Sequence, residues 1–307
     1  MSFAKHETFY IREGWLFKGM AAIVGAQERE QLPTIFQDAD APEQLGIGRN
    51  MVRALRFWMQ ATGLAEERLE QRQRTQRLTP LGHLVWQHDR YLEETDTLWL
   101  IHYQLVCSHQ HATTWYWFFN HFAPATFDQH TCLEALRDWV ISTFPDQEFA
   151  LSSLEKDIDC LLKTYLFDGT SRVPEDLRES PLSRLGLLSS YSDGNKKQYR
   201  LERADSVSLD PRLVLYVLLD RQLQNRTTAR QVRLGEVLRE PMNVGRVFNL
   251  TATTLIEILK ELNMRYPDYT VQFVRTEGLD DLTLPVCTPT EVLSHYYIQR
   301  ILAHEAE

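Results

Sequence analysis

Apolar residues recur at helical spacing along most of this chain, and turn-forming residues interrupt them, which limits the fold more than any other feature of the sequence. A parallel sheet would require strands that alternate with helices, and the sequence shows no such alternation. Clear breaks fall at 80–82, 144–149, 168–181 and 210–211. The pattern predicts a mostly α protein with small β hairpins.

The composition is that of a globular protein with a substantial core. The chain has 307 residues, of which 43% are hydrophobic, and this length favours more than one compact unit. No run of about 18 apolar residues exists, and the first ten residues lack the apolar stretch of a signal peptide. We therefore expect a cytoplasmic protein that does not contact membranes.

The cysteines and the net charge narrow the choice of ligands. Cys107, Cys132, Cys160 and Cys287 lie too far apart in the sequence for a zinc motif or a disulfide scaffold, so we expect reduced thiols. The formal net charge is −9, which means that any contact with nucleic acid must come from a local basic patch.

Such a patch is predicted on a helix that begins at Arg49. At about 100° per residue, Arg53, Arg56 and Gln60 fall on the same face as Arg49. The opposite face is apolar and carries Met51, Val52, Leu55, Trp58 and Met59. The basic and the apolar residues therefore form separate faces of one helix.

The residues around this helix predict a winged helix-turn-helix unit. Asp40 and Pro42 suit the start of a short helix, and Gly46 suits a left-handed turn after it. An apolar segment at 14–26 provides a first helix, and 64–82 resembles the hairpin that follows the second helix in winged-helix domains. A dinucleotide-binding loop is excluded, since Met51 stands where the third glycine would be.

Between residues 47 and 80 there are seven arginines and three glutamates, a local charge of +4. Guanidinium groups neutralise phosphates and can also bind guanine in the major groove, so we predict contact with double-stranded DNA. Near the start of the helix, Arg49, Asn50 and Arg53 suit base edges. The predicted DNA-binding set here is Arg49, Asn50, Arg53, Arg56, Gln60, Arg68, Arg72, Arg74 and Arg77. A protein-binding winged helix and a merely solvated face remain alternatives.

The segment 89–145 is rich in aromatic residues and histidines. Cys107, His109 and His111 alternate but lack a fourth ligand at a suitable spacing, so we predict no metal site. The aromatic run from Trp115 to Phe122 is more typical of a core than of base stacking. The acidic residues at 93–96 read as a solvated turn, so we expect no catalytic residue and no cofactor.

Two further helix-plus-hairpin segments are predicted. Asp193-Gly194 marks a hairpin, and Lys196, Lys197 and Arg200 near its tip are additional candidates for DNA contact. A purely structural hairpin is an equal alternative. The C-terminal segment, with a helix capped by Thr251 or Thr253, is winged-helix-like. The predicted domains are 1–88 (winged helix-turn-helix), 89–145 (helical middle), 146–209 (helix plus hairpin) and 210–307 (winged-helix-like).

The sequence also resembles the bacterial family of domain of unknown function 4007. The resemblance rests on stretches at 6–19 (HETFYIREGWLFKG), 45–58 (LGIGRNMVRALRFW), 78–82 (LTPLG), 89–106 (DRYLEETDTLWLIHYQLV), 115–122 (WYWFFNHF) and 245–250 (GRVFNL). It implies a protein of prokaryotic defence gene clusters, particularly those that place phosphorothioate in DNA. It implies no catalytic residue.

Taken together, these observations predict a non-catalytic, double-stranded DNA-binding accessory protein of a DNA-modification or restriction system. One alternative is an adaptor that recruits a PAPS-reductase-like modification enzyme, another is a transcriptional regulator, and a nuclease is a distant fourth. We expect a protein partner in a modification complex. A homodimer stays open, because symmetric winged-helix dimers are common but no heptad seam is present.

Overall fold

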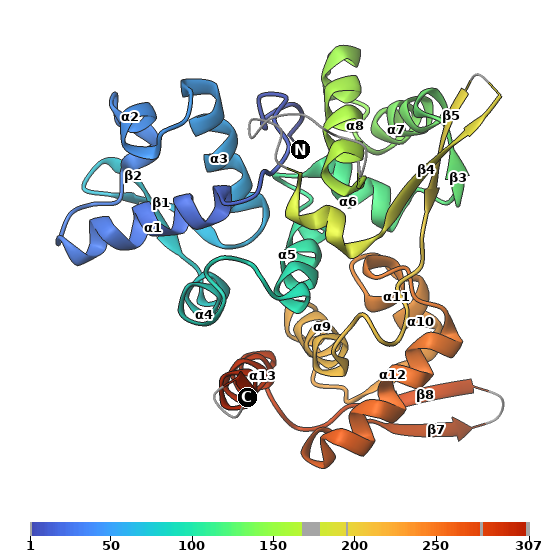
Figure 1. Ribbon diagram of the computed structural model, residues 1–307. Coiled ribbons are helices and arrows are strands. Elements are labelled where there is room, and N and C mark those ends of the chain that lie inside the picture. The colour runs from blue at the N-terminus through green and yellow to red at the C-terminus, as the bar shows by residue number, and fades with distance from the viewer. Residues whose placement is uncertain (1, 168–178, 195, 277–278, 305–307) are drawn as a thin grey trace. The chain divides into compact units, whose positions relative to one another are not determined.

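The computed structural model describes residues 2–167, 179–194, 196–276 and 279–304. Helices predominate in this part of the chain, and the strands form three small antiparallel sheets, as the sequence predicts (Figure 1). Most of the predicted break at 168–181 lies outside the described residues. The chain divides into two compact units, residues 1–202 and 203–307.

The first unit begins with helices and one hairpin. The order is α1 (Trp15–Glu28), the short 3-10 helix η1 (Ile35–Gln37), α2 (Ala41–Leu45), α3 (Arg49–Ala61), β1 (Ala65–Glu70), β2 (Gln73–Leu78) and α4 (Pro80–His88). Gly46 ends α2 with φ 62°, the left-handed conformation that the sequence predicts for it. α1 packs against α3, β2 and α4. The helix, turn and helix predicted from Asp40 onward are therefore present, and so is the hairpin predicted at 64–82. The hairpin ends at Leu78, however, and residues 80–82, predicted as a break, form the first turn of α4.

The next helices form an aromatic core. They are α5 (Thr95–Cys107), α6 (Thr113–Asn120), α7 (Gln129–Thr143), α8 (Leu151–Tyr165) and the 3-10 helix η2 (Pro181–Leu185). Trp115, Phe118 and Phe119 are buried, which confirms the prediction of a core. His102 lies in this core, with Nδ1 2.7 Å from the Tyr165 hydroxyl.

The second sheet joins two of the predicted domains. Its order is β3 (Thr126–Phe127), β5 (Lys196–Leu201) and β4 (Leu188–Asp193), and β3 pairs with β5 across the long intervening sequence. Asp193 and Lys196 pair at the hairpin that the sequence predicts. Segments 89–145 and 146–209 share this sheet, and residues 89–202 lie in one compact unit together with 1–88.

The second unit, described by itself, combines helices with a three-stranded sheet. Its elements are α9 (Pro211–Gln224), β6 (Gln231–Arg233), α10 (Leu234–Arg239), α11 (Val244–Val247), α12 (Ala252–Arg265), the 3-10 helix η3 (Pro267–Tyr269), β7 (Gln272–Thr276), β8 (Leu279–Thr283) and α13 (Pro289–His304). Thr251 caps α12 by accepting a hydrogen bond from the Thr254 amide at 3.1 Å, as predicted. Its compact unit begins at residue 203, seven residues before the predicted boundary.

None of the described helices combines the length and the apolar character that a membrane-crossing helix requires.

Candidate nucleic-acid interface

The apolar face of α3 fixes this helix in the first unit. Val52, Leu55, Trp58 and Met59 are at most 4% exposed, and the Trp58 indole N–H donates to the Phe9 carbonyl at 2.9 Å. Met51 is the exception in the predicted apolar face, because it is only half-buried. The face that carries the arginines is consequently turned outward.

The first turn of α3 is open to a ligand. Gly48 is its N-cap and has no side chain to accept from the first amides, so these N–H groups keep their partial positive charge. Arg49 is exposed, and no described residue forms a hydrogen bond or ion pair with it. Asn50 accepts a hydrogen bond from Arg53 at 3.4 Å, and Arg53 lies 3.8 Å from the Glu7 carboxylate.

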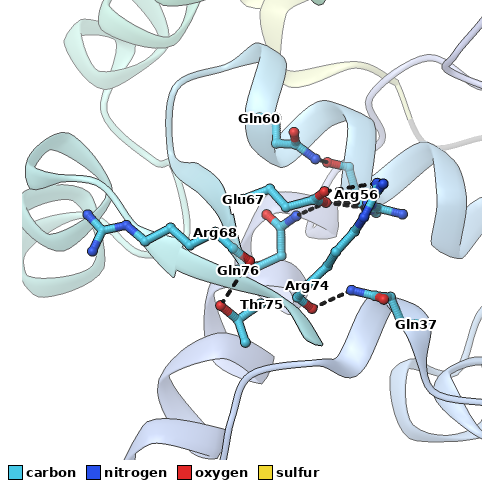
Figure 2. Close-up of polar contacts among 8 residues, drawn as sticks. All are labelled: Gln37, Arg56, Gln60, Glu67, Arg68, Arg74, Thr75 and Gln76. Atoms are coloured by element: carbon cyan, nitrogen blue, oxygen red, sulfur yellow. Dashed lines mark hydrogen bonds and ion pairs between the residues drawn. The ribbon is translucent and has the colours of Figure 1, made fainter. Parts of the chain in front are cut away.

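A cluster of polar side chains joins α3 to the hairpin (Figure 2). The Glu67 carboxylate accepts from Arg56 Nε at 2.9 Å, from Gln76 Nε2 at 3.2 Å and from Arg74 Nη1 at 3.3 Å. Gln60 donates to the Arg56 carbonyl of its own helix at 3.3 Å. Arg56 therefore differs from the free phosphate-binding cation that the sequence suggests, since it is half-buried in an ion pair.

Two other arginines of the hairpin are also paired. Arg77 binds Glu70 with a nitrogen–oxygen distance of 2.6 Å, and Arg68 pairs with Glu66 on the same strand. The hydrogen bond from Arg77 lowers the pKa of the Glu70 carboxyl, and the pKa of Arg77 is raised by the same bond. The three glutamates already counted in the net +4 therefore pair with Arg56, Arg68, Arg74 and Arg77. Much of the net charge is left at Arg49, Arg53 and Arg72.

The tip of the hairpin has an unusual backbone. Glu70 and Gln73 pair across it, which leaves Gln71 and Arg72 as a two-residue loop. Their φ angles are 49° and 66°, a conformation that glycine and asparagine adopt at much lower cost. Arg72 is exposed, and no described residue bonds to it. The hairpin thus presents an unpaired cation on a strained turn.

Beside the cluster lies a surface depression of about 460 Å³. Its lining comes from the N-terminal segment, α3, the hairpin and the turn after α5. The lining residues are Ser2, Lys5, Arg53, Arg56, Phe57, Gln60, Glu67, Arg74 and His111. Glu67 is the only carboxylate among them, so the depression has an excess of positive charge.

A buried polar network anchors the N-terminal segment at this depression. Asp157 of α8 accepts from the Ala4 amide at 2.7 Å, from His6 Nε2 at 2.8 Å and from the Thr114 hydroxyl at 2.6 Å. The Thr8 amide donates to His6 Nδ1 at 3.1 Å, so the ring proton is on Nε2 and the imidazole is neutral. His6 also packs within 5.7 Å of the Trp115 ring. The network thereby holds Lys5 and Glu7 next to α3.

Comparisons with known proteins identify the family. A family model described as "Protein of unknown function (DUF4007)" matches residues 3–297. The chain belongs to the DUF4007 family. Two solved structures are similar to it, "Magnesium ion-bound SspB crystal structure" at 30% identity and "SspB crystal structure" at 29%. In each case the TM-score is 0.82, with 96% of this chain and 88% of the other covered. No curated protein sequence matches the chain.

In this DUF4007 protein, some predicted site residues come together and others do not. Arg53, Arg56, Gln60 and Arg74 share the depression, whereas Arg49 lines a smaller one of about 250 Å³ beside α2. The exposed cations Lys196, Lys197 and Arg200 belong to the second sheet, and no described contact joins them to α3 or its hairpin. Lys197 and Arg200 instead lie over tyrosine rings of the same hairpin, at 5.5 and 5.4 Å from the centroids.

Three residues of this site escaped the sequence-based reasoning. Lys5 and His111 reach it from distant parts of the chain, and nothing in the sequence links them to α3. In the sequence, Glu67 differs in nothing from the neighbouring glutamates, although it organises the cluster. The surrounding chain displaces water from part of the His111 ring, and this loss of solvation lowers its pKa. The Glu67 carboxylate raises the pKa and so partly offsets the effect. The residue as a whole remains exposed.

The other candidate ligands of the DUF4007 chain are dispersed. None of the four cysteines forms a disulfide with another described residue. Cys132 and Cys160 are buried, while Cys107 and Cys287 are half-buried. Within the described ranges, no group of three or more His, Cys, Asp or Glu side chains could hold a metal ion. His121 belongs to the run 115–122 that the sequence predicts as core, but it is exposed and lies 3.1 Å from the Tyr116 hydroxyl, because it follows the last turn of α6.

Proposed function

We propose that residues 15–88 form a winged helix-turn-helix unit that binds double-stranded DNA without catalysis. In this proposal α3 is the recognition helix and the β1–β2 hairpin is the wing. The protein serves a DNA-modification or restriction assembly. This follows from its resemblance to a protein family that is encoded in defence gene clusters linked to phosphorothioation.

One observation carries the proposal: the uncapped start of α3 and the hairpin tip each present an exposed arginine that no described residue binds. Arg49 lies at the first position of α3, where the amide groups also attract anions. Arg72 lies at the tip of the hairpin. In DNA-binding units of this type, the helix enters the major groove and the neighbouring cations contact the backbone.

The test is duplex binding by fluorescence anisotropy over a range of salt concentrations. We expect Arg49→Glu combined with Arg72→Glu to weaken binding about 10- to 100-fold and to reduce the salt slope by about two. The matched control is Lys156→Glu combined with Lys260→Glu, which reverses two exposed cations on α8 and α12. Equal affinity of both variants and the native protein would refute this use of α3 and the hairpin.

Adaptor function is the second candidate, because the second unit exposes apolar side chains. Leu223, Met264 and Val286 are 67%, 75% and 84% exposed, and a partner enzyme could cover them. If the native protein fails to bind duplex at low salt but binds a modification enzyme, the adaptor proposal replaces the DNA-binding one. A transcriptional regulator, in contrast, would prefer one sequence upstream of its own cluster.

Magnesium belongs in the same experiment, because one SspB structure is described as magnesium ion-bound. Supercoiled plasmid is incubated with the protein and Mg²⁺, and nicked or linear products are measured. We expect neither product. Cleavage that follows the protein peak through purification, and that persists in a preparation from a nuclease-deficient host, would overturn the non-catalytic proposal.

A further inference from the structure

The depression beside α3 collects cations from three separate parts of the chain. Lys5 comes from the N-terminal segment, Arg53 and Arg56 from α3, and Arg74 from β2. Glu67 is the only acidic residue that lines it. Four permanent positive charges therefore surround one lining carboxylate, and Glu7, outside the lining, lies 3.8 Å from Arg53. The remaining excess of two positive charges requires another anion or solvent.

The contacts of Glu67 resemble those of a bound oxyanion. Arg56 donates to one carboxylate oxygen from Nε at 2.9 Å, and Gln76 donates to the same oxygen at 3.2 Å. Arg74 donates to the other oxygen at 3.3 Å. Figure 2 shows both arginine side chains directed toward Glu67, while Arg68 points away. Guanidinium groups recognise phosphate with the same paired donors that they offer to a carboxylate.

We propose that the depression is a phosphate-binding site in which the Glu67 carboxylate occupies the place of the ligand's oxygen atoms until a phosphate group enters. Arg56, Arg74 and Lys5 bind the phosphate, and Glu67 moves aside. The source of the phosphate, but not the site itself, rests on the proposed DNA binding. In that case the duplex contacts α3 at Arg49 and reaches the depression with one of its phosphates.

Two other lining residues fit a phosphate. Lys5 is exposed and has no hydrogen-bond partner among the described residues, so its ammonium group is free to bind. His111 has a lowered pKa through loss of solvation, and its neutral imidazole retains one N–H donor for a phosphate oxygen. Neither side chain has to break an existing ion pair.

The site is tested first with inorganic phosphate as the probe, in full-length protein, by titration followed through the ¹H resonances of His111. Glu67→Gln removes the competing charge but keeps a hydrogen-bonding side chain of the same size. We expect it to tighten phosphate binding about three- to tenfold. Lys5→Gln, at an exposed position, should weaken binding about threefold. The control Glu66→Gln removes a carboxylate that faces Arg68 and should change nothing.

Opposite results overturn the proposal. If Glu67→Gln binds phosphate no better than the native protein, or less well, then Glu67 only organises the arginines. If Lys5→Gln binds as tightly as the native protein, the depression is not the site. Because Lys5 is exposed and unpaired, its variant keeps the fold, and this arm remains decisive even if Glu67→Gln loosens the hairpin.

The source of the phosphate is found with two duplexes of equal sequence. One is linear with 5′-phosphates, and the other is closed by a loop at each end. If the site takes a backbone phosphate, Glu67→Gln binds both duplexes more tightly than the native protein does. If the site takes a terminal phosphate, only the linear duplex binds more tightly. If neither duplex binds more tightly, DNA is not the source of the phosphate. If the native protein binds no duplex, the proposed function fails, while the inorganic phosphate titration still decides the site.

Discussion

The network around Asp157 makes a sharp prediction about the stability of the first unit. Its carboxylate accepts three hydrogen bonds, from the Ala4 amide, His6 Nε2 and the Thr114 hydroxyl, and it is 2% exposed. Asp157→Ala leaves these buried donors without an acceptor. Each such donor costs about 1–3 kcal/mol, and because the losses of neighbouring groups do not add fully, we expect a total of about 3–5 kcal/mol.

Asp157→Asn is the informative comparison. The amide oxygen can still accept from Ala4 and His6, and the amide nitrogen can donate to the Thr114 oxygen. Because His6 is neutral in this network, only the charge-assisted part of the bonds is lost, about 1 kcal/mol. The N-terminal segment should then keep its three left-handed residues, Ala4 at φ 53°, Glu7 at 51° and Thr8 at 68°.

Thermal unfolding followed by tryptophan fluorescence measures these effects. All seven tryptophans lie before residue 203, so the signal reports the first unit alone. We expect a fall in Tm of about 6–20 °C for Asp157→Ala and about 2–4 °C for Asp157→Asn, at about 2–4 °C per kcal/mol. Asp159→Ala on the same helix, which loses only an exposed pair with Lys163, should stay within about 2 °C. If the alanine and asparagine variants lower the Tm equally, the conclusion that the His6 imidazole is neutral is wrong.

Two further predictions concern positions where glycine is favoured or required. Gln71→Asn combined with Arg72→Gly should stabilise the first unit by about 1–2 kcal/mol in the fluorescence assay, because both residues have left-handed φ angles. The same variant should bind duplex more weakly, and unchanged binding would show that Arg72 does not contact DNA. Gly82→Ala should destabilise by at least about 2 kcal/mol, since its Cβ would lie 2.0 Å from the Leu64 carbonyl oxygen. The control is Gly25→Ala in α1, where only the Arg29 side chain is near, at 3.4 Å; this change should leave the stability of the first unit unchanged or raise it. If Gly82→Ala lowers the stability no more than this control, the steric argument is wrong.

Local signals in the sequence predict several elements of the first unit. The two faces of α3 follow from the spacing of Arg49, Val52 and Arg53, and the left-handed Gly46 marks the turn before it. The hairpin at 188–201 follows from Asp193-Gly194. These features depend on residues within a few positions of one another, where propensity and periodicity act directly.

Long-range and strained features were beyond the same reasoning. The ion pairs of Glu67 require the register of β1 against β2 and the placement of Arg56, which no spacing rule provides. The Gln71–Arg72 turn contains neither of the residue types that usually mark such a loop. The contribution of Lys5 depends on His6 and Asp157, which lie 151 positions apart.

The pairing of β3 with β5 delays the completion of the second sheet while the chain is being synthesised on the ribosome. Phe127 and Tyr199 are partners in register, so β3 emerges roughly 70 residues before its neighbour. At about 5–20 residues per second, this leaves the strand edge uncovered for about 4–14 s during synthesis. Nascent chains paused in that interval should be the ones that bind chaperones or aggregate.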